Sequence, residues 1–277
     1  MDMTREIRIE EGKLKVVFEI QENGVVELKQ FDPAGRMDVK ERDRGEEDFY
    51  PITEVQITGR GTRGMHAYKH NVSGGATDFV YQSHEVLENE KGKELVIHTA
   101  TEYGVKGEYH MQFYPNVAAV QVWTTLKNEG TEKIGLEYVS SFIYQGLCQS
   151  GEKPYFEKTS IYTPHNSWDC ESQWRKNDCR EINLSGMAVN GFNTPGFGMN
   201  RYCYGGHSSW STCEYLPMGI CEDEECKVTY FFQVEHSGQW LIEYGPSTGE
   251  RLYVALSGAT ETEHGWWKNL KPGDTFT

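Results

Sequence analysis

Alternating apolar and polar positions run through most of this chain and predict β-strands. Every second residue of an early segment, 14–20, is apolar, so these side chains fall on one face of a strand. The pair Asn23-Gly24 follows and predicts a type I′ hairpin turn, because both central residues of that turn need positive φ. The chain then returns as a second strand over residues 25–28.

The same reading predicts further strands along the chain. They cover residues 94–99, 107–114, 118–126, 136–143, 228–236, 240–244 and 252–257. Turn-forming Gly and Asn residues separate many of them. No segment shows helical periodicity over more than two turns, although a short helix is expected within residues 172–178.

Many strands separated by turns indicate packed antiparallel sheets rather than a parallel α/β fold. We therefore expect an all-β protein, a large two-sheet antiparallel β-sandwich. Residues 1–277 are expected to form a single domain, since large sandwiches reach this size. Residues 41–48 predict a charged surface stretch, and the Gly- and Asn-rich residues 186–206 predict a long loop.

The net charge of the chain limits the classes of ligand that it is expected to bind. The chain has a net charge of −15, and such an acidic surface repels nucleic acid and anionic lipid. We expect no nucleic-acid or membrane partner, whereas neutral ligands such as sugars remain compatible. The 13% aromatic content suits both strands and sugar-binding surfaces, so it does not separate these two uses.

The cysteines indicate a reducing compartment. Seven cysteines, an odd number without a C-x-x-C pair, argue against a disulfide framework and against a zinc knuckle. The N-terminal residues contain no apolar signal-peptide core, and no apolar run approaches membrane-spanning length. These features predict a cytoplasmic protein with reduced thiols.

A first cluster of possible binding residues lies at residues 165–174. Trp168 and Trp174 stand there among Asn, Asp, Glu and Gln. A pyranose ring stacks its C–H face on an aromatic ring while its hydroxyls take directional hydrogen bonds, so this mixture suits a sugar. The alternative is a pair of core tryptophans on an irregular segment, with polar groups that satisfy loop backbone.

Three other motifs have weaker functional interpretations. Trp210, in the Ser- and Thr-rich residues 206–217, indicates either a loop facing a partner domain or an ordinary turn. Glu235 and His236 are an acid–base combination, but neighbours on a strand point to opposite faces and do not easily share a site. The pair His66 and His70 lacks a nearby acidic ligand, which disfavours a metal site. We expect no metal and no cofactor.

The C-terminal third of the chain resembles a known domain. The strings QVEHSGQW at 233–240, LYVALSG at 252–258 and WKNLKPGDTF at 267–276 are similar to the end of the N-terminal β-supersandwich of glycoside hydrolase family 36, the α-galactosidase family. The motif that begins at Trp210 adds to the likeness, which is most specific over about the last 80 residues. The same architecture resembles galactose mutarotases.

The resemblance implies that the catalytic residues lie in another domain of the enzyme. In this family the supersandwich precedes a (β/α)8 barrel whose two aspartates hydrolyse terminal α-galactosides with retention, and whose nucleophile lies in a Lys-x-Asp-x-Asn motif. The nearest string here, Lys176-Asn177-Asp178, lacks the final Asn and lies in a β-rich region. No residue of this chain is therefore assigned a catalytic role. We expect the domain of a bacterial enzyme whose barrel and C-terminal β-domain are absent from this chain.

The resemblance also implies partners. The domain would pack on the barrel, support a homo-oligomer and lend a loop to a galactoside site. Candidate substrate-binding residues are Arg63, in a locally basic segment, with Trp168 and Trp174. Candidate domain-interface residues are Trp210, Trp266 and Trp267; the last two are adjacent and should point opposite ways if the segment is extended.

Two alternatives remain open at this point. The first alternative is a free-standing carbohydrate-binding module. The second is an epimerase similar to the mutarotases, which use a His acid and a Glu base in a concave sheet. An isolated non-catalytic domain is expected to be inactive on α-galactosides.

Overall fold

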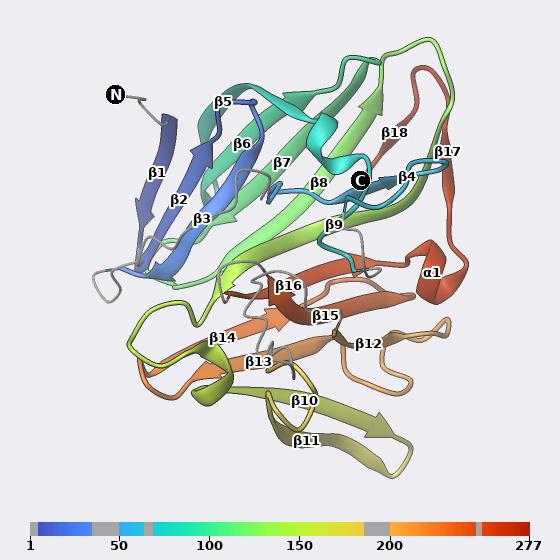
Figure 1. Ribbon diagram of the computed structural model, residues 1–277. Coiled ribbons are helices and arrows are strands. Elements are labelled where there is room, and N and C mark those ends of the chain that lie inside the picture. Colours follow the sequence, from blue (N-terminus) through green and yellow to red (C-terminus); the bar gives the residue numbers. More distant parts are fainter. Residues whose placement is uncertain (1–4, 35–49, 64–68, 186–199, 248–250) are drawn as a thin grey trace, which may run out of the picture.

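The computed structural model describes residues 5–34, 50–63, 69–185, 200–247 and 251–277, and it is almost entirely β (Figure 1). This confirms the predicted all-β class. The described strands are β1 (Arg5–Glu11), β2 (Leu14–Ile20), β3 (Val26–Pro33), β4 (Val55–Ile57), β5 (Val80–Asn89), β6 (Gly92–Ala100), β7 (Val105–Phe113), β8 (Val120–Asn128), β9 (Ile134–Leu147), β10 (Thr159–Ser167), β11 (Cys170–Asp178), β12 (Tyr202–Gly206), β13 (Met218–Asp223), β14 (Val228–Gln233), β15 (Trp240–Ser247), β16 (Arg251–Gly258), β17 (Lys268–Leu270) and β18 (Thr275–Phe276).

Within the described residues, helix is confined to short pieces. These are the 3-10 turns η1 (Ala76–Asp78) and η2 (Tyr155–Glu157) and one α-helical turn, α1 (Glu261–His264). Thr260 caps α1 through its side chain, and Gly265 closes it with a φ of 63°. No described helix has the length and apolar character needed to cross a membrane.

The strands form antiparallel sheets whose neighbours are mostly close in sequence. The sheet orders are β1-β2-β3, β18-β8-β7-β6-β5, β12-β15-β16-β9-β17 with β4 also on β9, and β11-β10-β13-β14. The long strand β9 joins the two halves of the molecule: its first half pairs with β4 and β17, and its second half pairs with β16 (Figure 1).

A hydrophobic core connects all of these sheets. Phe18 of β2 packs edge-on against Tyr109 of β7, with ring centroids 5.9 Å apart. Phe142 of β9 contacts Phe31 of β3 at 5.7 Å and Phe232 of β14 at 6.2 Å. Each buried aromatic ring removes a large apolar area from water, which stabilises the packing of sheet on sheet.

Three local predictions need correction. Residues 172–178 are part of strand β11 rather than a helix, because they pair with β10 across a tight turn at Asp169, whose φ is 59°. The predicted loop 186–206 contains strand β12, while residues 186–199 lie outside the described residues, as do residues 41–48. The hairpin at residue 24 exists, but only Gly24 has positive φ there.

The turn at this hairpin shows why the type differs. The Gly24 N–H donates to the Gln21 carbonyl and the Gln21 N–H donates to the Val25 carbonyl, both at 2.9 Å. The Asn23 side chain accepts a further bond from the Val25 N–H at 3.0 Å. This is a type I turn followed by a left-handed glycine, the arrangement typical of a three-residue loop.

Candidate functional site

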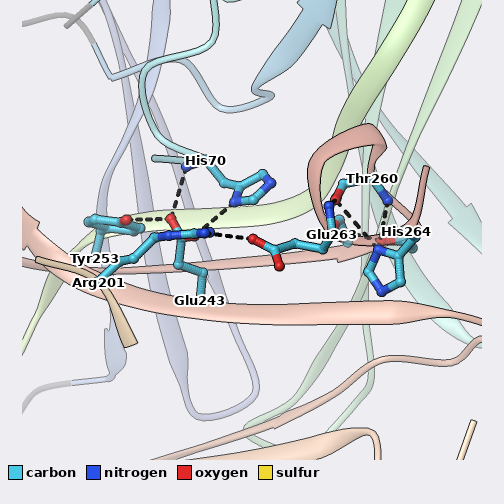
Figure 2. A network of polar contacts seen from close by, with 9 residues as sticks. His70, Arg201, Glu243, Tyr253, Thr260, Glu263 and His264 are labelled. Atoms are coloured by element: carbon cyan, nitrogen blue, oxygen red, sulfur yellow. Dashed lines mark hydrogen bonds and ion pairs between the residues drawn. The ribbon is translucent and has the colours of Figure 1, made fainter. Parts of the chain in front are cut away.

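A group of charged side chains surrounds the buried Glu243 on β15 (Figure 2). Its carboxylate accepts bonds from the backbone N–H of His70 at 2.9 Å and from Arg201 Nη1 at 2.9 Å, and it lies 2.8 Å from the Nδ1 atom of His70. The Tyr253 hydroxyl donates to it as well. Four groups from three separate parts of the chain therefore converge on one carboxylate.

These contacts determine the charge state of Glu243. Burial alone would raise the pKa of this fully buried carboxyl. The charge of His70 and the hydrogen bonds from His70, Tyr253 and Arg201 outweigh burial and bring the pKa to about 2. The group is therefore ionised at neutral pH, and it is a weak base.

The network continues to helix α1 (Figure 2). Arg201 also donates through Nη2 to Glu263 at 2.6 Å, so it joins β15 to the helix. The backbone N–H of Thr260 donates to His264 Nδ1 at 3.1 Å, and the His264 ring stacks on His207 with centroids 5.0 Å apart. Burial lowers the pKa of His264, and the neighbouring His207 adds to this effect.

Sequence reasoning missed this network. A usable signal was present, because Glu243 interrupts an otherwise apolar strand, and a charge in a buried strand requires partners. The partners themselves could not be identified, since His70 and Arg201 lie far from Glu243 in sequence. Of the predicted metal pair, His70 is bonded to Glu243, and His66 lies outside the described residues.

A second feature is a groove of about 1220 Å³ between β8 and β14. Residues of β9 and β16 also line it, and its lining includes both aromatic and amide side chains. The Gln121 amide donates to Glu235 at 2.6 Å across it, and Gln239 donates to the His207 carbonyl at 3.2 Å. Apolar walls with a few polar groups are typical of small-molecule sites.

The predicted acid–base pair lies at this groove. Glu235 and His236 follow the end of β14, and both line the cavity. Glu235 accepts the bond from Gln121, whereas His236 Nδ1 accepts from the Gly238 N–H at 3.1 Å. The two side chains thus have separate partners, but they lie beyond the end of the strand and line the same groove, so the premise that they point to opposite faces of a strand does not hold.

Arg63 is occupied by internal contacts. Its guanidinium forms an ion pair with Glu54 and donates to the carbonyls of Asn71 at 2.9 Å and Ser73 at 3.0 Å. Glu54 is fully buried, and burial raises its pKa although Arg63 partly offsets the effect. The observed contacts give Arg63 a structural use, and its role toward a substrate stays a prediction.

The two Trp-containing clusters come together in space. The backbone N–H of Asn166 donates to the Glu214 carbonyl at 2.8 Å, and its side chain donates to the Thr212 carbonyl at 2.6 Å. The hairpin of β10 and β11 is thereby attached to the loop that carries Trp210. The exposed fractions of Trp168, Trp174 and Trp210 are 81%, 38% and 60%. These rings are on the surface, so the alternative of two core tryptophans is wrong.

The adjacent tryptophans near residue 270 have different surroundings. Trp266 is half-buried and packs on Phe276 with centroids 5.5 Å apart, whereas Trp267 is 63% exposed. This agrees with the expectation that the two rings point opposite ways. The proposed role of Trp210, Trp266 and Trp267 at a domain interface stays a prediction.

One described group, Asp223, Glu225 and Cys226, brings three possible metal-ligating atoms together. The Lys158 ammonium lies 2.8 Å from Asp223 and 3.4 Å from Glu225, so a side-chain cation already neutralises these carboxylates. The cluster is therefore explained by the fold. All seven cysteines have free thiols in the structure.

Comparison with known proteins shows which solved structures share this fold. No family model and no curated protein sequence matches the chain. Among solved structures, the GH36 α-galactosidase AgaB from Geobacillus stearothermophilus is similar over 99% of this chain and 38% of its own, at 14% identity and a TM-score of 0.72. The α-galactosidase from Lactobacillus brevis is similar over 99% of this chain and 38% of its own, at 12% identity and a TM-score of 0.67.

A shorter protein is also similar. The galactose mutarotase-like protein from Lactobacillus casei covers 98% of this chain and 97% of its own, at 11% identity and a TM-score of 0.51. The chain thus spans well under half the length of the α-galactosidases and nearly all of the mutarotase-like protein. At these identities the comparisons show a shared β-sandwich fold, as the sequence resemblance predicted.

Proposed function

We propose that this chain is a non-catalytic β domain of an α-galactosidase-like glycoside hydrolase, and that it packs against a catalytic barrel. The observation that carries the proposal is the match of nearly the whole chain to about 38% of the AgaB chain. The motifs at 233–240, 252–258 and 267–276 support it from sequence. The exposed ring of Trp267 supplies an apolar surface for such a contact.

The chemistry of Glu243 supports a non-catalytic role. A retaining glycosidase needs two carboxyl groups about 5 Å apart on either side of the scissile bond, one of them with a raised pKa. Glu243 is enclosed by donors and its pKa is about 2, so it has neither the access nor the proton affinity for this work. In the proposal its function is to hold β15 and the segment at His70 together.

Two measurements test the proposal. The purified 277-residue chain should not hydrolyse an aryl α-galactoside, and turnover that persists through repurification would overturn the non-catalytic assignment. The gene beyond the codon for Thr277 should encode a barrel with a Lys-x-Asp-x-Asn motif. A stop codon directly after Thr277 would contradict the proposed domain arrangement.

A free-standing sugar-binding protein or epimerase is the second candidate. The full-length match to the mutarotase-like protein and the groove between β8 and β14 favour it. The His70–Glu243 pair argues against epimerisation, because the two groups bond each other and leave no space for a sugar between them. Calorimetry with galactosides and polarimetry on fresh α-galactose separate this candidate from the first.

A further inference from the structure

The sheet β11-β10-β13-β14 has an outer face that the proposed function does not use. Its register aligns Lys176, Tyr162, Ile220 and Phe231 in one row across the four strands. Their neighbours along the strands, such as Ile161, Cys221 and Phe232, are buried in the core. Because side chains alternate between the two faces, the row points away from the core.

Aromatic rings stand in the open on this face. Phe231 is 56% exposed and Tyr162 is half-buried. Trp174, 38% exposed, lies on the same face two residues from Lys176 along β11. Tyr162 and Phe231 are separated by one strand, so their backbones are about 9.6 Å apart. That spacing is comparable to the length of a disaccharide.

Charged groups surround the Tyr162 ring and neutralise each other. The Tyr162 hydroxyl donates to Glu222 at 2.6 Å, and Lys176 pairs with Glu224 at 2.6 Å. The Lys176 ammonium also lies 5.7 Å from the Tyr162 ring centroid. The cores of protein interfaces are depleted in charged residues, so single rings separated by ion pairs suit a wet, hydroxyl-rich ligand better than a protein.

From this arrangement we propose that the outer face of β11-β10-β13-β14 binds a neutral, linear saccharide chain. Trp174 and Phe231, on the two outermost strands of the sheet, stack against pyranose rings several units apart along the chain, and Glu222, Lys176 and the Tyr162 hydroxyl between them exchange hydrogen bonds with the sugar hydroxyls. We expect the saccharide to be uncharged because the protein carries a net charge of −15 and repels polyanions. Phe231 also lines the groove between β8 and β14, whereas Trp174, Tyr162 and Trp267 do not, and the site does not depend on the proposed function.

Affinity electrophoresis of the 277-residue chain tests the site in native gels that contain galactomannan, hydroxyethylcellulose or soluble starch. Migration should be retarded in at least one gel. Trp174→Ala and Phe231→Ala should each weaken binding about tenfold, from the loss of one ring's apolar contact. Trp267→Ala, which removes an exposed ring elsewhere, should migrate as the unaltered chain does.

The contrary results are clear. Unretarded migration in all three gels overturns the proposal, and so does retardation that Trp174→Ala and Phe231→Ala leave unchanged. Phe231→Tyr keeps a ring at the same position and should retain binding, which separates loss of the ring from loss of folding. Thermal melts verify that each variant is folded. None of these results bears on α-galactoside hydrolysis or on barrel association.

Discussion

At the scale of single residues, the fold depends on one buried anion with several donors. Glu243 connects β15 to the segment at His70 and, through Arg201, to helix α1. The hydrogen bond of each donor alone contributes modestly to stability, but removal of the Glu243 carboxylate leaves several buried donors without an acceptor. Such a loss costs far more than the net contribution of a single bond.

Replacement of this carboxylate should be severe. Glu243→Gln leaves the Arg201 guanidinium without its buried anion, and we expect the free energy of unfolding to fall by about 3–5 kcal/mol. Urea denaturation followed by fluorescence measures the change. Glu235→Gln is the matched control, because Glu235 is exposed and should change stability by less than about 0.5 kcal/mol. Equal effects of the two substitutions would contradict this account.

The lowered pKa of Glu243 predicts that the folded chain loses stability in acid. The pKa of Glu243 is lowered from 4.5 to about 2 in the folded chain. Its stabilisation is therefore complete above about pH 4.5 and is lost as the pH falls toward 2, an effect of about 3 kcal/mol. Unfolding free energies measured between pH 6 and pH 2.5 should show this decline. In Glu243→Gln the decline over the same range should be smaller by about that amount.

At the scale of elements, neighbouring residues differ in what they stabilise. In the segment before β17, Trp266 packs on Phe276 of β18, while Trp267 faces outward. The segment thus attaches the C-terminal strands to the domain on one side and presents an aromatic ring on the other. The hairpin of β10 and β11 also has two roles, since Asn166 holds a loop and Trp174 is exposed.

The two tryptophans can be separated by experiment. Trp266→Ala should lower the free energy of unfolding by about 1–3 kcal/mol through lost apolar burial. Trp267→Ala should change it by less than about 0.5 kcal/mol, since an exposed ring has little packing to lose. Differential scanning calorimetry of the two variants provides the comparison. A larger loss for Trp267→Ala would mean that this ring belongs to the core.

At the scale of the whole molecule, the distribution of thiols reports on packing. Cys170 and Cys213 are exposed, whereas Cys148, Cys179 and Cys221 are buried. Burial raises the pKa of the Cys179 and Cys221 thiols well above the usual value, with the nearby Cys148 thiol contributing most for Cys221. The thiolate is the reactive form, so the buried groups should be inert in the folded chain.

Titration with a thiol reagent checks this distribution. The native chain should show two rapidly reacting thiols, and the denatured chain should show all seven. Cys170→Ser with Cys213→Ser should remove the rapid phase. A denatured count of five or fewer would instead indicate a disulfide in the native protein.

The sequence by itself determined the strand class and the positions of nine of the eighteen described strands. In β6, β7, β14 and β16, β-branched and aromatic residues recur at strand spacing, and local periodicity is sufficient to identify such strands. The motif at 233–240 and those that follow it also identified the supersandwich fold, which the structural comparisons confirm. Both kinds of information are local in sequence, so no knowledge of distant contacts was needed.

Only the tertiary structure decided the rest. Strand β11 is exposed on both faces, so it lacks an apolar alternation, and its pairing with β10 determines its conformation. Its outward row of rings was not apparent from the sequence, since the row joins two hairpins, β10-β11 and β13-β14, through the pairing of β10 with β13, which lie far apart in sequence. The Glu243 network likewise joins residues 70, 201 and 253, which meet only when β12 and β16 pair with β15 and the segment at His70 packs against that sheet. Local patterns record which residues are buried, whereas the partners of a buried charge depend on the topology of the whole chain.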